Sequence, residues 1–413
     1  MFGKEHILYR ICLAFALVIF VFSPLRAESI LLDNLKFSSK LNLFWAQAHT
    51  PANFTDKYHK ASAKIDVNLS YSITENFDIV FLPYIQTSYD INRTDKTQTK
   101  AKIWQGYFNY KFSDFKFSLG RFDFADEHLA PFVYYGENLT ADLALPTSLE
   151  GIKHSLPSKY FDYTLLAARE TSLNAEKKAK IAGANVSINP SNWFSISGFY
   201  FLQNKDYFKD NKDTSEYLSL YGGGINLTFS ANSGLRFYAA QNGGNKKSKR
   251  LGLTQKISYK GYGFSGELYF ANTYKNAILN NKLGFYVFSD NKKFYTLPNK
   301  LNTGIIYGGM NYRNRFPASP KIIYGNFEFN SGKYPFLFAG ADIFVYASGN
   351  NILNGRTYYA KEINLNAALK FDSWGFKLSG GLFEGEALFV GGATTEKQKI
   401  KKLQANFFYK FSL

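Results

Sequence analysis

Hydrophobic and polar residues alternate with a period of two along most of the chain. The alternation is clearest in segments 35–45, 63–73, 225–230 and 362–371; in 63–73 every odd position is apolar and every even position is polar or charged. Because side chains of a β-strand point to opposite faces in turn, each segment predicts a strand with one apolar and one polar face. No tract after residue 27 has the length of a membrane-spanning helix, and no linker interrupts the pattern. The chain is therefore expected to be all-β.

Aromatic residues make up 18% of the sequence and recur on the apolar faces of nearly every predicted strand. A transmembrane β-barrel has this combination, since its lipid-facing and lumen-facing residues alternate and aromatic girdles mark both membrane interfaces. A large secreted all-β protein would also alternate, but it would not need so many outward aromatic side chains. We predict a transmembrane antiparallel barrel.

The last strand ends on an aromatic ladder that consists of Phe407, Tyr409, Phe411 and Leu413. A terminal amphipathic strand must pair with another strand to satisfy its backbone. The ladder resembles the C-terminal assembly signal that outer-membrane barrels present to the barrel-assembly machinery, although that family usually closes with Phe or Trp. We expect this strand to close the barrel.

Short and long connections also alternate. Tight turns are expected at 74–76, 113–114, 189–192, 231–234 and 372–373, and long connections near 47–60, 122–150, 203–216 and 272–301. Outer-membrane barrels have short periplasmic turns and long external loops. At roughly 22 residues per strand and connection the chain has room for 16 to 18 strands, and we predict 18. A direct count of the predicted strands gives 19. An odd number would place the two termini on opposite sides of the membrane, so at least one segment between 272 and 335 is wrongly counted as a strand.

The N-terminus has the pattern of a secretory signal peptide. Lys4 and Arg10 precede an apolar run over 11–22, and the small-residue end at Ala27 is typical of a cleavage site. We therefore predict a signal peptide at 1–27 and one outer-membrane barrel domain at 28–413. The single cysteine, Cys12, falls within the signal peptide.

One hairpin carries a family resemblance. Residues 103–110 read Ile-Trp-Gln-Gly-Tyr-Phe-Asn-Tyr and residues 115–122 read Phe-Lys-Phe-Ser-Leu-Gly-Arg-Phe. This hairpin resembles that of OprD-like porins and of the major outer-membrane porins of epsilonproteobacteria. The resemblance implies a passive diffusion channel whose third external loop folds into the lumen. Arg121 departs from the alternation, because it shares parity with the apolar Leu119; a bulge or a position near the rim must accommodate it.

The segment from Phe122 to Glu150 is acidic and has no lysine or arginine; its carboxylates are Asp123, Asp126, Glu127, Glu137, Asp142 and Glu150. Alternation places basic side chains on the lumen wall, at Lys64, Lys111, Lys116, Arg236, Lys256 and Lys370. An acidic constriction loop facing a basic wall would orient dipolar solutes and influence ion selectivity. In the alternative arrangement the segment lies over the barrel mouth.

The formal net charge is +17. Export argues against nucleic acid as the partner of this charge, and external basic residues such as Lys246 and Lys247 are expected to pair with lipopolysaccharide phosphates at the outer-membrane lipid surface. Oligomeric state stays open between monomer and homotrimer.

Chemistry beyond diffusion finds little support in the sequence. His154 and Ser155 are adjacent and so lie on opposite faces of a strand, which is poor geometry for a base and nucleophile. No spaced cluster predicts a transition metal or any cofactor, although the loop carboxylates could hold Ca²⁺. We predict a porin that passes ions and small hydrophilic solutes and is not an enzyme. The alternative is a surface barrel acting as an adhesin or ligand-binding protein.

Overall fold

The computed structural model describes residues 34–49, 58–90, 98–126, 128–135, 148–171, 179–206, 215–250, 253–274, 277–289, 303, 321–347, 359–386 and 397–412. The predicted signal peptide, residues 1–27, lies outside the described residues. No helix within the described part of the chain is long and apolar enough to cross a membrane.

The described residues form eighteen strands in one sheet. The strands are β1 (Leu35–His49), β2 (Tyr58–Thr74), β3 (Phe77–Asp90), β4 (Gln98–Phe112), β5 (Phe115–Phe122), β6 (Ser148–Leu156), β7 (Phe161–Thr171), β8 (Ala179–Ser191), β9 (Phe194–Asp206), β10 (Ser215–Ser230), β11 (Ser233–Arg250), β12 (Leu253–Tyr274), β13 (Ala277–Phe288), β14 (Lys321–Ser331), β15 (Leu337–Ala347), β16 (Tyr359–Lys370), β17 (Trp374–Glu386) and β18 (Lys397–Ser412).

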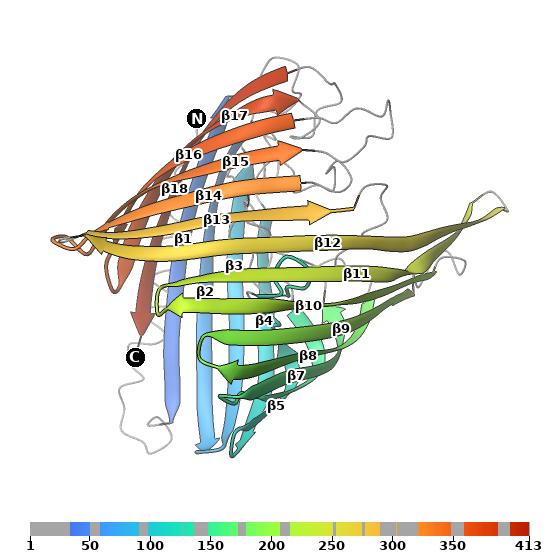
Figure 1. The fold of residues 1–413 in the computed structure, drawn as a ribbon. Helices are drawn as coiled ribbons and strands as arrows, with labels where there is room; N and C mark the ends of the chain where they lie inside the picture. Colours follow the sequence, from blue (N-terminus) through green and yellow to red (C-terminus); the bar gives the residue numbers. More distant parts are fainter. Residues whose placement is uncertain are drawn as a thin grey trace.

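Each strand pairs antiparallel with its neighbours in sequence, and β18 pairs with β1, so the sheet closes into a barrel (Figure 1). The closing register places Ser39 opposite Phe411 and Leu43 opposite Phe407. The prediction of an 18-strand antiparallel barrel is confirmed. Closure matters physically because an open sheet edge in hydrocarbon would leave backbone groups without partners.

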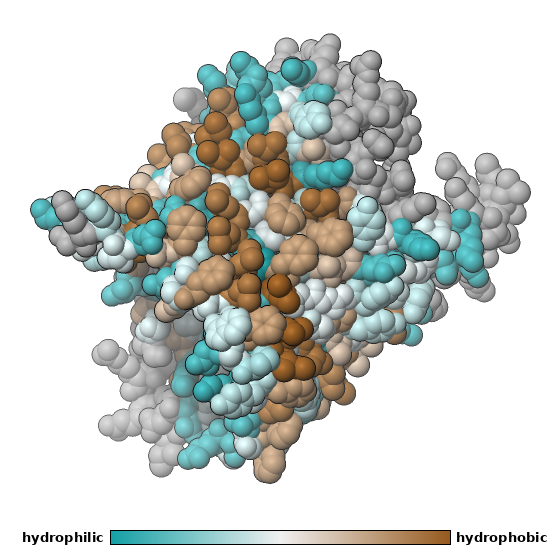
Figure 2. All heavy atoms as spheres, viewed as in Figure 1, coloured by the Kyte–Doolittle hydropathy of each residue, from teal (hydrophilic) through white to brown (hydrophobic). Residues whose placement is uncertain are grey.

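The alternation determines the face of each side chain. Leu119, Ile152 and Leu365 are exposed on the outside, at 45%, 44% and 65% of their surface, as lipid-facing residues should be when no lipid is present. Their sequence neighbours point into the barrel; Ser118 and Asn364, for example, are buried. Figure 2 shows the outward hydrophobic side chains as a brown band across the front strands, with polar side chains toward the ends. The band is the surface that a bilayer would cover.

Short turns gather at one end of the barrel and long connections at the other. The turns at 75–76, 113–114, 192–193, 231–232 and 371–373 lie within the expected segments or overlap them by all but one residue. The long connection expected at 272–301 is wrong, since residues 277–288 form β13. Asn280 and Lys282 of this strand face the lumen, near the short-turn end of the barrel.

Candidate functional site: the lumen and its inward connection

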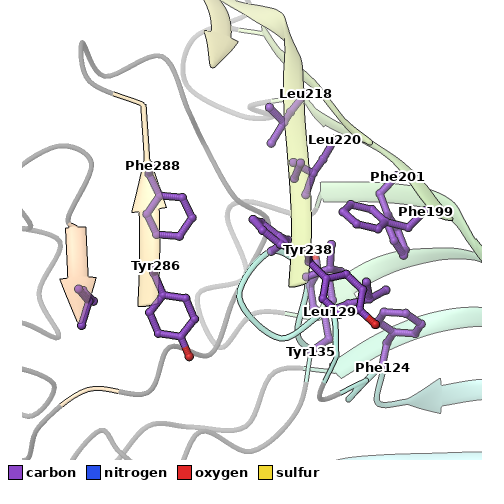
Figure 3. Packing of buried hydrophobic residues seen from close by; sticks show 14 of the residues in the cluster. Phe124, Leu129, Tyr135, Phe199, Phe201, Leu218, Leu220, Tyr238, Tyr286 and Phe288 are labelled. Atoms are coloured by element: carbon purple, nitrogen blue, oxygen red, sulfur yellow. The ribbon is translucent and has the colours of Figure 1, made fainter. Parts of the chain in front are cut away.

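The described part of the connection after β5, residues 123–126 and 128–135, lies inside the barrel. Its apolar side chains are buried, with Phe132 and Tyr135 at 0% exposure and Leu129 at 1%. Phe132 stacks on Phe199 of β9 at 6.0 Å between ring centroids and meets Phe288 of β13 edge-on at 6.4 Å. Figure 3 shows Leu129 and Tyr135 of the connection among side chains of the inner wall, and Figure 1 shows the connection within the ring of strands. The described part, 123–126 and 128–135, therefore rests on the inner wall formed by β7 to β13.

Polar contacts fix the same connection. The Asp126 carboxylate accepts hydrogen bonds from the Asn185 side chain of β8 at 3.0 Å and from the backbone N–H of His128 at 2.8 Å. The Lys153 ammonium of β6 donates to the backbone carbonyl of Asp123 at 3.1 Å and lies 5.0 Å from the centre of the Phe122 ring. Apolar burial and these hydrogen bonds together hold the chain in one place.

A cavity of about 780 Å³ lies between this connection and the opposite wall. His128, Ala130 and Pro131 line it from the connection, and side chains of β11 to β17 line it from the wall. Such a volume admits a small hydrophilic solute with its water. The lumen is thus narrowed on one side and polar on the other.

The cavity wall is a network of paired charges. Glu267 of β12 accepts a hydrogen bond from the Tyr324 hydroxyl at 2.9 Å and lies 3.5 Å from Arg236 and 3.6 Å from Lys282. Lys370 lies 3.8 Å from Glu328, and its ammonium is 3.7 Å from the centre of the Phe338 ring. The wall therefore carries both signs of charge at close quarters.

One acid on this wall is held by amides. The Asp342 carboxylate of β15 accepts hydrogen bonds from Asn326 of β14 at 2.8 Å and from Asn366 of β16 at 2.6 Å. Two amide donors stabilise the charge without neutralising it. Asp342 thus lies on the same cavity lining as Arg236 and Lys282, in one cross-strand row with Asn326 and Lys282.

The six predicted basic wall residues lie in different places. Arg236 and Lys370 line the cavity. Lys64 pairs with Asp66 at 2.8 Å and Lys111 with Asp78 at 3.1 Å, both away from the cavity, and Lys116 is exposed beside the 113–114 turn. The basic wall that the sequence predicted is thus largely ion-paired, because carboxylates of other strands share its face.

Lys256 does not face the lumen, although the sequence analysis placed it on the lumen wall. It has the parity of Tyr262 and Leu268, which are 53% and 37% exposed on the outside of β12, whereas Tyr259 is buried and donates to Glu216 inside the barrel. An inward Tyr259 puts Lys256, three positions away, on the opposite face. Lys256 therefore faces outward.

Glu150 does not belong to the inward connection, although the sequence analysis counted it among the carboxylates of the constriction loop. It belongs to β6 and lies on the outward face, where Arg169 approaches it at 3.0 Å and Arg121 at 4.0 Å. Arg121 also donates to the Ile103 carbonyl at 2.9 Å. This group sits at the end of the strands from which the long connections leave, so the rim position accommodates Arg121.

The remaining acidic candidates divide between described and undescribed residues. Asp123 and Asp126 lie in the inward connection and serve its anchoring as above. Glu127, Glu137 and Asp142 lie outside the described residues. Within the described part of the chain no three acidic, His or Cys residues are grouped as metal ligands, and the Ca²⁺ hypothesis stays a prediction.

His128 is the titratable group of the connection that faces the passage. Its ring stacks on Tyr238 at 6.3 Å, and it lines the cavity with Arg236 and Glu267. Partial desolvation, and after it the Arg236 charge, lower the pKa of His128 below its ordinary value of 6.5. The imidazole is therefore neutral at neutral pH. By contrast, His154 lies on the outer face between the rings of Phe115 and Tyr163, away from Ser155.

Comparison with solved structures identifies the architecture. OpdQ of Pseudomonas aeruginosa superposes with a TM-score of 0.62 at 12% identity, over 92% of this chain and 99% of that chain. The barrel has the OprD-type fold. OccK8 (OprE) of the same organism gives 0.61 at 12% identity over 92% and 99%, and Acinetobacter baumannii OccAB2 gives 0.59 at 11% over 93% and 100%. No protein-family model matches the chain, and no curated protein is similar to it in sequence.

Sequence reasoning missed several lumen residues. Glu328 and Lys282 were not assigned to the wall, although Glu328 alternates with the outward Phe327 and Phe329. Lys153 was not assigned to the anchor of the connection, and no local pattern marks that role. The apolar run from Leu129 to Tyr135 was the available signal, since a solvated loop has no need of it.

Proposed function

We propose that this chain is an outer-membrane porin, which forms a water-filled channel for passive diffusion of ions and small hydrophilic solutes. One observation carries the proposal: a closed barrel with an apolar outside holds a polar cavity beside a connection that narrows the lumen. The OprD-type fold agrees with it. Barrels of this strand number are wide enough to leave an aqueous passage.

The proposed selectivity element is a mixed-charge passage. Arg236, Lys282 and Asp342 face one lumen, and the inward connection limits its width. Opposite fixed charges in a narrow space of low dielectric constant favour solutes that carry both charge signs or a dipole. The contribution of the undescribed loop carboxylates to this constriction belongs to the proposal.

Reconstitution of the purified barrel in planar bilayers tests the function. A porin gives stepwise currents that are stable under moderate voltage. Arg236→Gln combined with Lys282→Gln should shift the reversal potential in a salt gradient toward cations, while the exposed pair Lys159→Gln and Lys333→Gln at the short-turn end should leave it unchanged. A barrel without conductance that binds a host ligand tightly would instead indicate an adhesin.

The proposal includes the cellular setting. In a Gram-negative cell, a cleaved signal peptide would direct export of the chain, and the barrel-assembly machinery would then insert it. The mature barrel would lie in the outer membrane as a monomer or homotrimer. The outward band of hydrophobic residues supports this placement, because only a lipid environment makes it favourable.

A further inference from the structure

The β11–β12 hairpin extends past the neighbouring strand β13 at the end of the barrel opposite the short turns. The two strands have 18 and 22 residues, and β12 pairs with β13 only from Gly263 onward. Residues 253–262 of β12 therefore lie beyond the end of β13, and Figure 1 shows the hairpin projecting from the barrel. Lys246 and Lys247, expected in a loop, belong to this hairpin.

Three lysines share the outer face of the projecting part. Tyr262 is exposed on the outside, and Lys260 and Lys256 have its parity, whereas Tyr259 points inward. The strand register places Lys247 of β11 directly opposite Lys256. All three lysines are exposed.

No carboxylate compensates this face within the two strands. The described β11 sequence has no Asp or Glu, and the single acid of β12, Glu267, points into the lumen. Like charges directly opposite on an antiparallel pair are destabilising. The arrangement of Lys247 and Lys256 is therefore unfavourable unless an external anion lies against it.

The height of the lysines above the apolar band indicates which anion. With a rise of about 3.3 Å per residue and a strand tilt of about 40°, Lys260 lies roughly 5 Å and Lys256 roughly 15 Å above Tyr262. An exposed tyrosine on the outer face is typical of the membrane interface. The headgroup layer is about 5 to 8 Å thick, so Lys260 falls within it and the Lys247–Lys256 pair lies about 7 to 10 Å beyond it.

We propose that Lys247, Lys256 and Lys260 form a binding surface for the phosphate groups of lipopolysaccharide in the outer leaflet. This inference rests on the membrane placement given under the proposed function, but not on conductance. Phosphate groups at two depths, on the lipid anchor and on the attached sugars, match lysines at two depths. Point-like ammonium groups suit such a surface, because they accept phosphates in many orientations.

Binding of purified lipopolysaccharide to the detergent-solubilised full-length barrel tests the inference. The variant combines Lys247→Gln, Lys256→Gln and Lys260→Gln. The matched control combines Lys116→Gln, Lys159→Gln and Lys333→Gln, three exposed lysines at the short-turn end. Affinity of the first variant should fall on the order of a hundredfold, and affinity of the control should stay within about twofold of the unmodified protein.

Two further ligands identify the anion. Dephosphorylated lipopolysaccharide should bind the unmodified barrel as weakly as the native glycolipid binds the first variant, and phosphatidylglycerol should not compete. Equal affinity of both variants, undiminished binding of the dephosphorylated glycolipid, or full competition by phosphatidylglycerol would each overturn the inference. Heat-modifiable migration of both variants shows that they fold. A barrel that binds lipopolysaccharide but does not conduct would refute the proposed porin function and leave this inference standing.

Discussion

Replacement of Phe132 by alanine tests whether the inward connection sets the width of the channel. The Phe132 ring is fully buried between Phe199 and Phe288 on the inner wall, and no strand of the barrel depends on it for pairing. The substitution should therefore weaken docking of the connection and leave the strand ladder intact. The docked and released states of the connection then become the two states of the pore.

The magnitude follows from burial. Removal of a buried phenyl ring costs about 3 to 5 kcal/mol when the surroundings relax only partly. Since 1.4 kcal/mol is a factor of ten in an equilibrium constant, the ratio of docked to released connection should fall by roughly two to four orders of magnitude. Phe132→Leu keeps most of the volume and should cost less than about 1.5 kcal/mol.

Single-channel recording is the assay. We expect a larger mean conductance and more open-channel noise in Phe132→Ala, a small change in Phe132→Leu, and unaltered heat-modifiable migration in both. The control is Phe329→Ala, which removes an equal ring from the outer face of β14, where the side chain is 40% exposed. A folded Phe132→Ala barrel with the conductance and noise of the unmodified protein would refute the idea that the docked connection limits flow.

Three further predictions follow from facing, closure and charge. Leu69→Arg should destabilise the barrel by about 2 to 4 kcal/mol while its lumen-facing neighbour Asn68→Arg should not, as measured by denaturant titration in lipid; equal damage would mean that the assigned faces are reversed. Deletion of residues 411–413 removes the pairing of Ser39 with Phe411, so heat-modifiable barrel should be lost from membranes, and normal levels would contradict the role of this strand in closure. Because the docked state lowers the pKa of His128 below 6.5, the released state binds the proton more tightly, and docking should be strongest above pH 6.5 and weaken as pH falls below it. Channel noise should then increase in the unmodified protein as the pH is lowered from about 8 to about 5, and it should not change with pH in His128→Gln.

Much of the fold could be predicted because facing is a local property of a strand. From Lys60 to Thr74 of β2 each odd residue is apolar and each even residue is polar, and this alone orients Leu69 and Asn68. The method fails where an aromatic side chain faces inward. Tyr259 and Phe199 are aromatic residues of the kind expected on the lipid face, but they point into the barrel, where other parts of the chain cover them.

The site was less accessible to sequence reasoning, because its contacts join distant residues. Asp126 was assigned to the acidic segment, yet its bond to Asn185 spans 59 positions and no local signal announces it. The pairing of Glu267 with Arg236 needs the register of β11 on β12. Glu150 was misplaced for a simpler reason, since the acidic segment was extended to residue 150 although β6 begins at Ser148, so a strand residue was counted with the loop.

The inner wall explains why the connection lies where it does. Lumen-facing residues of β9 and β10 include the buried Phe199, Phe201 and Leu220, whereas the residues with which β14 to β16 line the cavity include Asn326, Asp342 and Asn366. An apolar patch facing a water-filled lumen is unfavourable, and the apolar side chains of 124–135 cover it. Amides and a carboxylate on the other wall are best left in contact with water and solute. The apolar patch on β9 and β10 therefore holds the connection on its own side and leaves the passage beside the polar residues on the other. Exchanging Phe199, Phe201 and Leu220 for polar side chains should release the connection without any change in its own sequence.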